Sequence, residues 1–270
     1  MRVFLTGASA GIGLLAAKAL CERGHRVWGT ARKAENLPVL ENFHPISMDL
    51  NNRDSIRIGF DQALGEAGRF DVLINNAGSG VFGPLEAFSD AELRAQMDVL
   101  FFGPLDLIRL VLPSMRAANK GLIVNVASLA AEFPLPFLAP YTVSKAALAS
   151  LTEGLGMELA HTDVRVIDLR PGDFATSFHL STRRVESPLN AAYQPNLDRA
   201  WKTIDHNMAA APDPQQVADV LVDIVEGRTR RPVVAVGDFF QARVAPFLVR
   251  LSPRAWVQWG LRMYYGLKKS

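Results

Sequence analysis

The sequence is poor in cysteine. Cys21 is the single cysteine among 270 residues, which excludes an internal disulfide and fits a reducing compartment. Cys21 lies in an apolar stretch that is typical of a helix. We therefore expect a buried small hydrophobic residue there and not a reactive thiol.

Large net charge and long apolar runs are missing as well. The chain has 29 Lys and Arg against 27 Asp and Glu, a net charge of +2, which gives no indication of a nucleic-acid partner. A charged or amide side chain interrupts every apolar run before the roughly 18 residues of a membrane-spanning helix. Met1-Arg2 leads directly into apolar Val3-Phe4-Leu5, which leaves no room for a secretory signal. We expect a cytoplasmic protein.

Metal-binding patterns are also missing. The five histidines show no metal-ligand spacing, so we expect no metal site. A hydrophobic content of 49% over 270 residues suits a single α/β domain with a large core.

A glycine-rich turn follows the first apolar segment. Residues 3–5 are typical of a buried strand, residues 6–13 form the turn, and a helix is expected to about Arg23. Glycines in such a turn let the backbone approach a pyrophosphate at the positive N-terminus of the helix. This order of elements indicates a dinucleotide site.

The end of the second expected strand, residues 26–31, bears on the choice of dinucleotide. Ala31 is followed by Arg32 and Lys33. Folds that prefer NAD place a carboxylate near this strand end, whereas the 2′-phosphate of NADP calls for arginine. We therefore favour NADP over NAD, with Arg32 as the main phosphate contact. Two solvated basic residues are the alternative.

Ligand-binding signals also follow later strands. Asp49 follows the third strand and could contact an adenine amino group or cap the next helix. Asn75-Asn76-Ala77-Gly78 follows the fourth strand, at the edge where a doubly wound sheet binds its ligand. A long helical pattern from Asp90 to about Ala118 contains Pro104, which predicts a kink near Leu100. The strands expected after the second are 44–48, 70–74, 122–126, 164–169 and 232–236.

Tyr141 and Lys145 lie one helical turn apart, on a helix that Pro140 opens. The phenol and the ammonium therefore project from the same helix face. A cation beside a phenol favours the phenolate, which makes Tyr141 a better proton donor and acceptor near neutral pH. Such a pair alone is weak evidence of proton transfer, because most Tyr-x-x-x-Lys pairs are ordinary neighbours on a helix surface. Ser128, which the fifth strand delivers, and the glycine turn strengthen it.

Together these motifs resemble the short-chain dehydrogenase/reductase family over roughly residues 2–236. The resemblance implies an α/β fold, a Rossmann-type doubly wound parallel sheet with seven strands in the order 3-2-1-4-5-6-7 and helices on both faces. It also implies hydride transfer between a nicotinamide and a ketone or secondary alcohol. The matching residues, in the family's order and spacing, are Thr6-Gly7-x-x-x-Gly11-Ile12-Gly13, Asn75-Asn76-Ala77-Gly78, Ser128, Tyr141-x-x-x-Lys145 and Pro171-Gly172.

The resemblance assigns roles to residues. In the family, the tyrosine matching Tyr141 protonates the carbonyl oxygen, and the serine matching Ser128 hydrogen-bonds that oxygen. The lysine matching Lys145 holds the nicotinamide ribose and lowers the tyrosine pKa. The implied catalytic residues are these three. The expected cofactor contacts are Gly7, Ser9, Gly11, Ile12, Gly13, Arg32, Asp49, Leu50, Asn76, Ala77, Gly78, Tyr141, Lys145, Pro171, Gly172 and Thr176.

One residue departs from the family pattern. If Gly103 is aligned, Leu100 stands where family members usually carry an asparagine that helps to hold a water next to the lysine. We expect the relay to survive through the backbone carbonyl and water, with Pro104 helping the bend. The alternative is an NAD(P)-binding sensor or scaffold with weak catalysis.

The region around residues 173–211 shows no clean periodicity, and we expect it to form a substrate lid within a catalytic domain of residues 1–237. Aromatic residues in this lid and the apolar stretch 133–138 indicate a hydrophobic substrate, such as a steroid-, retinoid- or acyl-like ketone. The expected substrate contacts are Ser128, Phe133, Tyr141 and Phe178.

The tail, residues 238–270, differs in charge. It holds six Lys or Arg and one acid, a charge of +5, so that residues 1–237 carry −3. Its expected helix places Trp256, Trp259 and Met263 on one face. We favour packing on the same domain, over the cleft or a partner subunit, and peripheral membrane contact is the alternative. A homodimer or homotetramer is also expected, since helices around 90–118 and 140–160 form such interfaces in the family.

Overall fold

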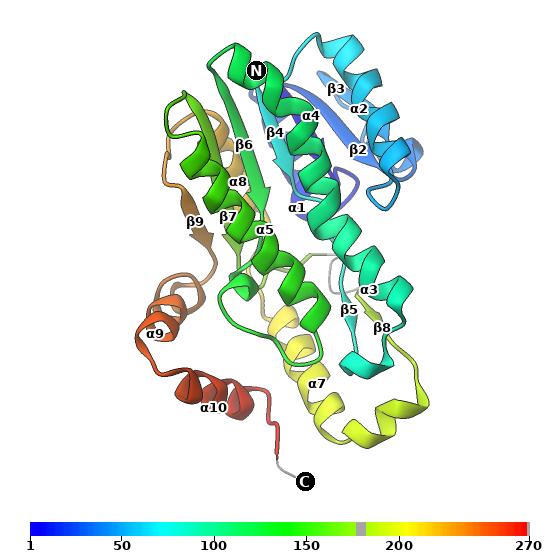
Figure 1. The fold of residues 1–270 in the computed structure, drawn as a ribbon, viewed down its shortest axis with the longest axis vertical. Helices are drawn as coiled ribbons and strands as arrows, with labels where there is room; N and C mark the ends of the chain where they lie inside the picture. Colours follow the sequence, from blue (N-terminus) through cyan, green and yellow to red (C-terminus); the bar gives the residue numbers. More distant parts are fainter. Residues whose placement is uncertain (177–181, 269–270) are drawn as a thin grey trace.

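A parallel sheet of seven strands forms the centre of the computed structural model, which describes residues 1–176 and 182–268 (Figure 1). Its strand order, β3-β2-β1-β4-β6-β7-β9, confirms the predicted doubly wound fold. Two short strands, β5 and β8, pair with each other outside this sheet. They change the numbering of the later strands but not the predicted order of the seven. The strands are β1 Arg2–Thr6, β2 Arg26–Ala31, β3 Phe43–Ser47, β4 Val72–Asn75, β5 Val81–Phe82, β6 Gly121–Val126, β7 Val164–Pro171, β8 Arg183–Arg184 and β9 Val233–Val236.

Helices cover both faces of the sheet. Helices α1 and α8 pack on one face, and α2, α4 and α5 pack on the other, where α4 and α5 lie in front of the sheet in Figure 1. The helices are α1 Gly11–Glu22, α2 Arg53–Ala67, α3 Asp90–Met97, α4 Gly103–Ala117, α5 Ala139–Glu158, α7 Asn196–Ala209, α8 Gln215–Val225, α9 Ala245–Leu251 and α10 Arg254–Tyr264.

Strand β1 shows how one strand supplies both core layers. Val3 and Leu5 point to the α1/α8 side, while Phe4 points to the other side, because successive side chains of a strand alternate. Phe4 is fully buried, and its ring centroid lies 5.2 Å from that of Phe70. Cys21 is buried on α1, as expected, and burial raises the pKa of its thiol to about 11, which disfavours the reactive thiolate.

The helical stretch predicted from Asp90 is interrupted near Leu100, as expected. The interruption is a π-helical turn over Asp98–Phe102, in which the N–H of Gly103 donates to the carbonyl of Asp98. Pro104 lies in the first turn of α4, just after this turn. Because a π turn tolerates the missing backbone N–H of Pro104, the helix widens at this point. We had expected a simple proline kink.

The region expected to be irregular contains helix α7. Leu197, Ala200 and Ile204 recur at three- and four-residue spacings and pack in one cluster with Leu138. The expectation of no periodicity is therefore wrong for this part of the segment. Phe178 lies outside the described residues. The lid role stays a prediction.

The tail forms α9 and α10, at the lower left of Figure 1. Leu261 and Tyr265 pack against α7, and Asn196 exchanges two hydrogen bonds with the backbone of Lys268, at 2.9 and 3.0 Å. The opposite side of α10 is open, with Trp256 71% and Trp259 67% exposed. The tail therefore packs on the domain through one side only.

No described helix, in residues 1–176 or 182–268, is long and apolar enough to cross a membrane. Within the same ranges, no group of three or more His, Cys, Asp or Glu is placed to hold a metal ion.

Candidate active site

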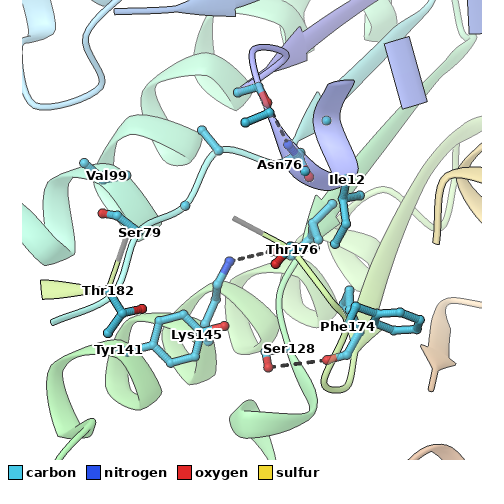
Figure 2. A pocket seen from close by; sticks show the side chains of 18 of the residues that line it. Ile12, Asn76, Ser79, Val99, Ser128, Tyr141, Lys145, Phe174, Thr176 and Thr182 are labelled. Carbon is cyan, nitrogen blue, oxygen red and sulfur yellow. Dashed lines mark hydrogen bonds between the residues drawn. The ribbon is translucent and has the colours of Figure 1, made fainter. Parts of the chain in front are cut away.

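A cleft of about 520 Å³ opens at the carboxyl ends of the parallel strands. Its walls come from the loops that follow β1, β2, β3, β4, β6 and β7, and from α5, α7 and the end of α10. This is the edge at which doubly wound sheets bind ligands, and the volume suits a small molecule with a cofactor. Figure 2 shows Tyr141 and Lys145 reaching into this space beside Ser128.

The glycine turn packs tightly against the loop after β4. Gly7 has φ +72°, and a Cβ at this residue would lie 2.8 Å from the Cα of Ala77. A Cβ at Gly13 would lie 2.1 Å from the carbonyl oxygen of Gly7. The Thr6 hydroxyl accepts hydrogen bonds from the N–H groups of Asn76 and Ala77, both 3.0 Å, so the two motifs hold each other in place.

The N-terminus of α1 has the properties of an anion site. It borders the cleft, its N-cap residue Ala10 supplies no capping side chain, and its first turn contains no acid. The first N–H groups of a helix lack partners within the helix and lie at the positive end of its dipole. A pyrophosphate group therefore fits at this end of the cleft.

Arg32 and Asp49 lie at the same end of the cleft. Arg32 follows β2, and its backbone carbonyl accepts a 3.1 Å hydrogen bond from Ser47. Asp49 accepts a 3.0 Å hydrogen bond from the N–H of Asn51, while Asn52 caps α2. Asp49 therefore shapes a turn and does not cap the helix directly.

Ser128 leaves the end of β6 in an extended conformation. Its hydroxyl accepts a 3.1 Å hydrogen bond from the N–H of Ala130 and lies 3.4 Å from the carbonyl oxygen of Pro171, to which it can donate. It also hydrogen-bonds with Tyr141. Strand β6 and helix α5 thus bring two predicted catalytic side chains together.

Lys145 is 4% exposed, and its ammonium donates a 2.7 Å hydrogen bond to the carbonyl oxygen of Val126. It lies 5.9 Å from the centre of the Tyr141 ring. Burial lowers the pKa of Lys145 to about 8, against an opposing effect of the Asp168 charge. The side chain is therefore close to its titration range at physiological pH.

The pKa of Tyr141 runs against the sequence expectation. Burial raises it to about 12, the hydrogen bond with Ser128 acts in the opposite direction, and the charge of Asp173 raises it further. We had expected Lys145 to lower this pKa. Its ammonium instead bonds the Val126 carbonyl, and desolvation of the phenol dominates. A phenol with this pKa stays protonated at neutral pH, as a proton donor requires.

Leu100, at the position of the family asparagine, is fully buried. A Cβ added at Gly78 would lie 3.4 Å from Leu100 Cδ2 and 4.0 Å from Lys145 Nζ. Leu100 and Lys145 therefore both border Gly78, and the leucine side chain has no polar atom to offer there. A proton relay through backbone groups and water, as expected from the sequence, stays a prediction.

The cleft gathers the residues that the sequence proposed. All of the expected cofactor positions, from Gly7 to Thr176, and all three catalytic residues line it. Phe133 is not among its lining residues, and Phe178 lies outside the described residues. Contact with a cofactor or substrate at any of these positions stays a prediction.

Other lining residues had escaped the sequence interpretation. Asp173 directly follows the Pro171-Gly172 motif, so its position could have indicated a pocket residue. Tyr265 carries no such signal, because only the path of the tail brings it to the cleft. The apolar side chains not named from the sequence at this end are Phe82, Ile204 and Met208, and they lie beside Leu135, Leu138 and Trp201 from the expected apolar stretch and lid.

Comparisons with known proteins agree with this geometry. A family model described as short chain dehydrogenase matches residues 1–186. A 3-ketodihydrosphingosine reductase of Bacteroides thetaiotaomicron is 34% identical over 270 residues, with 98% of each chain covered.

Solved structures resemble all or most of the chain. A short-chain dehydrogenase from Streptomyces avermitilis superposes with a TM-score of 0.79 at 28% identity, covering 99% of both chains. A metagenomic short-chain oxidoreductase in complex with NADP has a TM-score of 0.68 at 30% identity, covering 87% of this chain and 96% of its own. Structures similar to this chain contain NADP in some cases and NADH in others.

Proposed function

The chain belongs to the short-chain dehydrogenase family, and from this premise we propose that it is an NADP(H)-dependent reductase of hydrophobic long-chain ketones. The observation that carries the proposal is the hydrogen-bonded pair of Ser128 and Tyr141, at the apolar end of the cleft and next to Lys145. This pair can receive a carbonyl oxygen, and the apolar walls around it suit an aliphatic chain.

The side chains of the site handle the proton. Tyr141, protonated at neutral pH, donates its phenolic proton to the carbonyl oxygen as that oxygen becomes an alkoxide. Ser128 stabilises the same oxygen by a hydrogen bond. Lys145 provides a positive charge near the phenol, and its ammonium can hold a ribose hydroxyl. A bound nicotinamide supplies the hydride, so the products are a secondary alcohol and oxidised cofactor.

We propose NADP as the cofactor because of Arg32. The uncapped α1 N-terminus suits the pyrophosphate that NAD and NADP share. Arg32 lines the cleft after β2, where an arginine favours the 2′-phosphate of NADP.

We propose an acyl-like ketone as the substrate, in preference to a steroid or retinoid. The full-length similarity to a 3-ketodihydrosphingosine reductase supports this class. The apolar side chains of Leu135, Leu138 and Met208 in the cleft wall support it too.

Ketone turnover with both cofactors tests this function. We expect 3-ketodihydrosphingosine to be reduced faster than steroid or retinoid ketones, with at least a roughly tenfold higher kcat/KM for NADPH than for NADH, about 1.4 kcal/mol. A tenfold preference for NADH would contradict the role of Arg32. Failure to oxidise either cofactor with any ketone would instead favour the sensor or scaffold function, for which Leu100 is the supporting observation.

We further propose a homodimer or homotetramer in the cytoplasm. Phe102 in the π-helical turn and Val143 and Met157 on α5 are large apolar side chains that are 44%, 58% and 75% exposed. They lie on the helices expected to form subunit interfaces. Sedimentation equilibrium measures the state, and a monomer at micromolar concentration would contradict it.

The outer face of the tail suits an anionic membrane surface, and we propose peripheral contact there. More than half of the exposed large apolar side chains of the described chain lie in residues 238–268, including Phe247, Trp256 and Trp259. The same segment carries five Lys or Arg against one acid, whereas residues 1–237 are net negative, and Arg254 and Arg262 are exposed on α10. Exposed tryptophans beside arginines fit an interface with acidic headgroups.

Sedimentation with vesicles tests the membrane contact. We expect pelleting with vesicles of phosphatidylcholine and phosphatidylglycerol, little with phosphatidylcholine alone, and loss of pelleting on replacing Trp256→Ser and Trp259→Ser together. The same replacements at exposed Val39 and Ile58 are the control. If the tryptophan variant pellets normally but becomes monomeric, a second copy of the chain is the partner and the membrane proposal is wrong.

Charge reversal separates electrostatic from apolar binding. Arg254→Glu with Arg262→Glu should reduce pelleting at least tenfold, because each basic residue near an anionic surface contributes about 1 kcal/mol. Arg230→Glu with Arg231→Glu, exposed before β9, changes the net charge equally and should have a smaller effect. Equal effects would indicate non-specific attraction and contradict a docking face on the tail.

A further inference from the structure

A carboxylate lies among the apolar walls at the Tyr141 end of the cleft. Asp173 follows β7 and lines the cleft together with Ser128 and Tyr141. Asp49, another acid of the cleft lining, follows β3 at the Arg32 end. A carboxylate largely removed from water is costly unless an opposite charge or hydrogen bonds compensate it.

The tail holds this carboxylate in a fixed position. Gln241 donates through Nε2 to Asp173 Oδ2 at 3.0 Å, and its Oε1 accepts from the Asp173 N–H at 3.0 Å. The backbone N–H of Gln241 in turn donates to Asp238 at 2.8 Å. A Cβ at Gly172 would lie 2.4 Å from Gln241 Oε1, so the amide packs closely on the loop. This two-bond contact orients Asp173 but supplies no positive charge.

The electrostatic surroundings of Asp173 are unbalanced. Its pKa is raised, first by burial and also by the nearby charge of Asp238, while the Gln241 hydrogen bond acts in the opposite direction. None of the ion pairs found among the described residues involves Asp173. The negative charge of Asp173 in turn raises the pKa of Tyr141 and of Tyr265, which places it close to both. The cleft therefore has a carboxylate near the proton donor that lacks a cationic partner in the described chain.

We propose that Asp173 is a substrate-binding residue that pairs with an ammonium group carried next to the reacting ketone. The ketone oxygen would lie at Ser128 and Tyr141, with the ammonium at Asp173 and the aliphatic chain along the apolar wall. Since the ammonium belongs to the substrate, this role rests on the proposed ketone reduction. Within that function it selects 2-amino ketones over other hydrophobic ketones.

A matched pair of substrates tests the role. 3-Ketodihydrosphingosine carries an amino group beside its ketone, and the same ketone without the amino group is the comparison. We expect the wild-type protein to favour the amino ketone by roughly 10- to 100-fold in kcat/KM, the range for a charge-assisted hydrogen bond. Asp173→Asn, which keeps an acceptor for Gln241, should remove this preference and leave the amine-free ketone within about threefold. Glu41→Gln, an exposed acid outside the cleft, should keep it.

Two results would overturn the assignment. Equal loss on both ketones in Asp173→Asn would mean that the carboxylate acts through Tyr141 or the cofactor. The absence of any preference in the wild-type protein would remove the ammonium site altogether.

A binding measurement separates this inference from the proposed function. Calorimetry on the NADP⁺-saturated protein compares n-octylamine, charged at neutral pH, with 1-octanol. We expect the amine to bind about tenfold more tightly to the wild type and equally to Asp173→Asn. This result needs no turnover, so it stands even if ketone reduction fails. Equal binding of amine and alcohol to the wild type would refute an ammonium site.

Discussion

The two ends of the cleft are built in different ways. At the glycine turn, main-chain packing makes the site, since a Cβ at Gly13 would collide with the Gly7 carbonyl and with Asn76. At the other end, buried side chains make it, and burial shifts the pKa values of Tyr141 and Lys145 in opposite directions. One end therefore depends on the absence of side-chain atoms, and the other on the environment of a few side chains.

Because of this difference, we expect cofactor affinity to depend on one end of the cleft, and proton transfer and substrate choice on the other. Backbone N–H groups and a helix terminus bind any dinucleotide pyrophosphate, so the glycine end suits a shared part of the cofactor. In the proposed function, proton transfer and substrate choice fall to Ser128, Tyr141 and Asp173, and the cleft around them includes segments from the second half of the chain. Substitutions at the two ends should therefore fail in distinguishable ways.

The largest effect is expected from Tyr141→Phe at the side-chain end. Loss of the proton donor should lower kcat by roughly 10³-fold, within the range for general acid catalysis, while NADP affinity changes little. Steady-state kinetics and cofactor titration measure both quantities. The control is Tyr193→Phe in the proposed lid. This change removes the hydrogen bond from the Tyr193 hydroxyl to Glu86 and should keep most activity. Unchanged function in Tyr141→Phe would favour the sensor or scaffold.

At the backbone end, Gly13→Ala should disrupt the fold more than the chemistry. Its Cβ would lie 2.1 Å from the Gly7 carbonyl oxygen, so we expect a loss of about 3 kcal/mol in the free energy of unfolding and weak cofactor binding. Gly65→Ala, exposed on α2 with open space around its Cβ, should instead gain about 0.5–1 kcal/mol. Urea denaturation measures both. Equal stabilities would mean that the glycine end is not packed as described.

The pKa of Lys145 predicts a dependence of stability on pH. It is lowered from its ordinary value of 10.5 to about 8, so the unfolded chain binds more protons than the native protein between these pH values. The contribution of Lys145 to the free energy of unfolding therefore rises with pH across this window. The free energy of unfolding of the wild type, measured relative to that of Lys145→Met, should increase by about 2 kcal/mol between about pH 7 and about pH 10. A constant difference in urea-unfolding free energy would contradict the lowered pKa.

The smallest of these effects is expected from Arg32→Ala, at the exposed rim of the glycine end of the cleft. Loss of a charged phosphate contact should lower kcat/KM for NADPH about tenfold, or about 1.4 kcal/mol, and leave NADH unchanged. Lys33→Ala tests whether the neighbouring cation shares this role. Equal losses with both cofactors would place Arg32 at the pyrophosphate or in the fold instead.

Much of the first part of the chain could be predicted from local pattern. The glycine turn and the pairing of Tyr141 with Lys145 follow from short motifs, because strand and helix periodicity and backbone sterics act over a few residues. The strand order was implied by the family resemblance that these motifs carry, and the structure confirms it. Helix α7 was missed although its apolar spacing is regular, since the surrounding turns obscured it. The π-helical turn at Leu100 was expected only as a kink, because sequence shows where a helix is disturbed and not which hydrogen bonds replace it.

The sequence alone determined which side chains are available to the site, namely Ser128, Tyr141, Lys145 and an arginine after the second strand. Tertiary structure decided their electrostatic state, because the pKa of a phenol or an ammonium depends on desolvation by distant segments. It also decided the substrate end. Gln241 can hydrogen-bond to Asp173 only after the tail has folded across the end of the sheet. Tyr265 likewise reaches the cleft only once the tail has packed on α7. Contacts across such long separations have no local sequence signature.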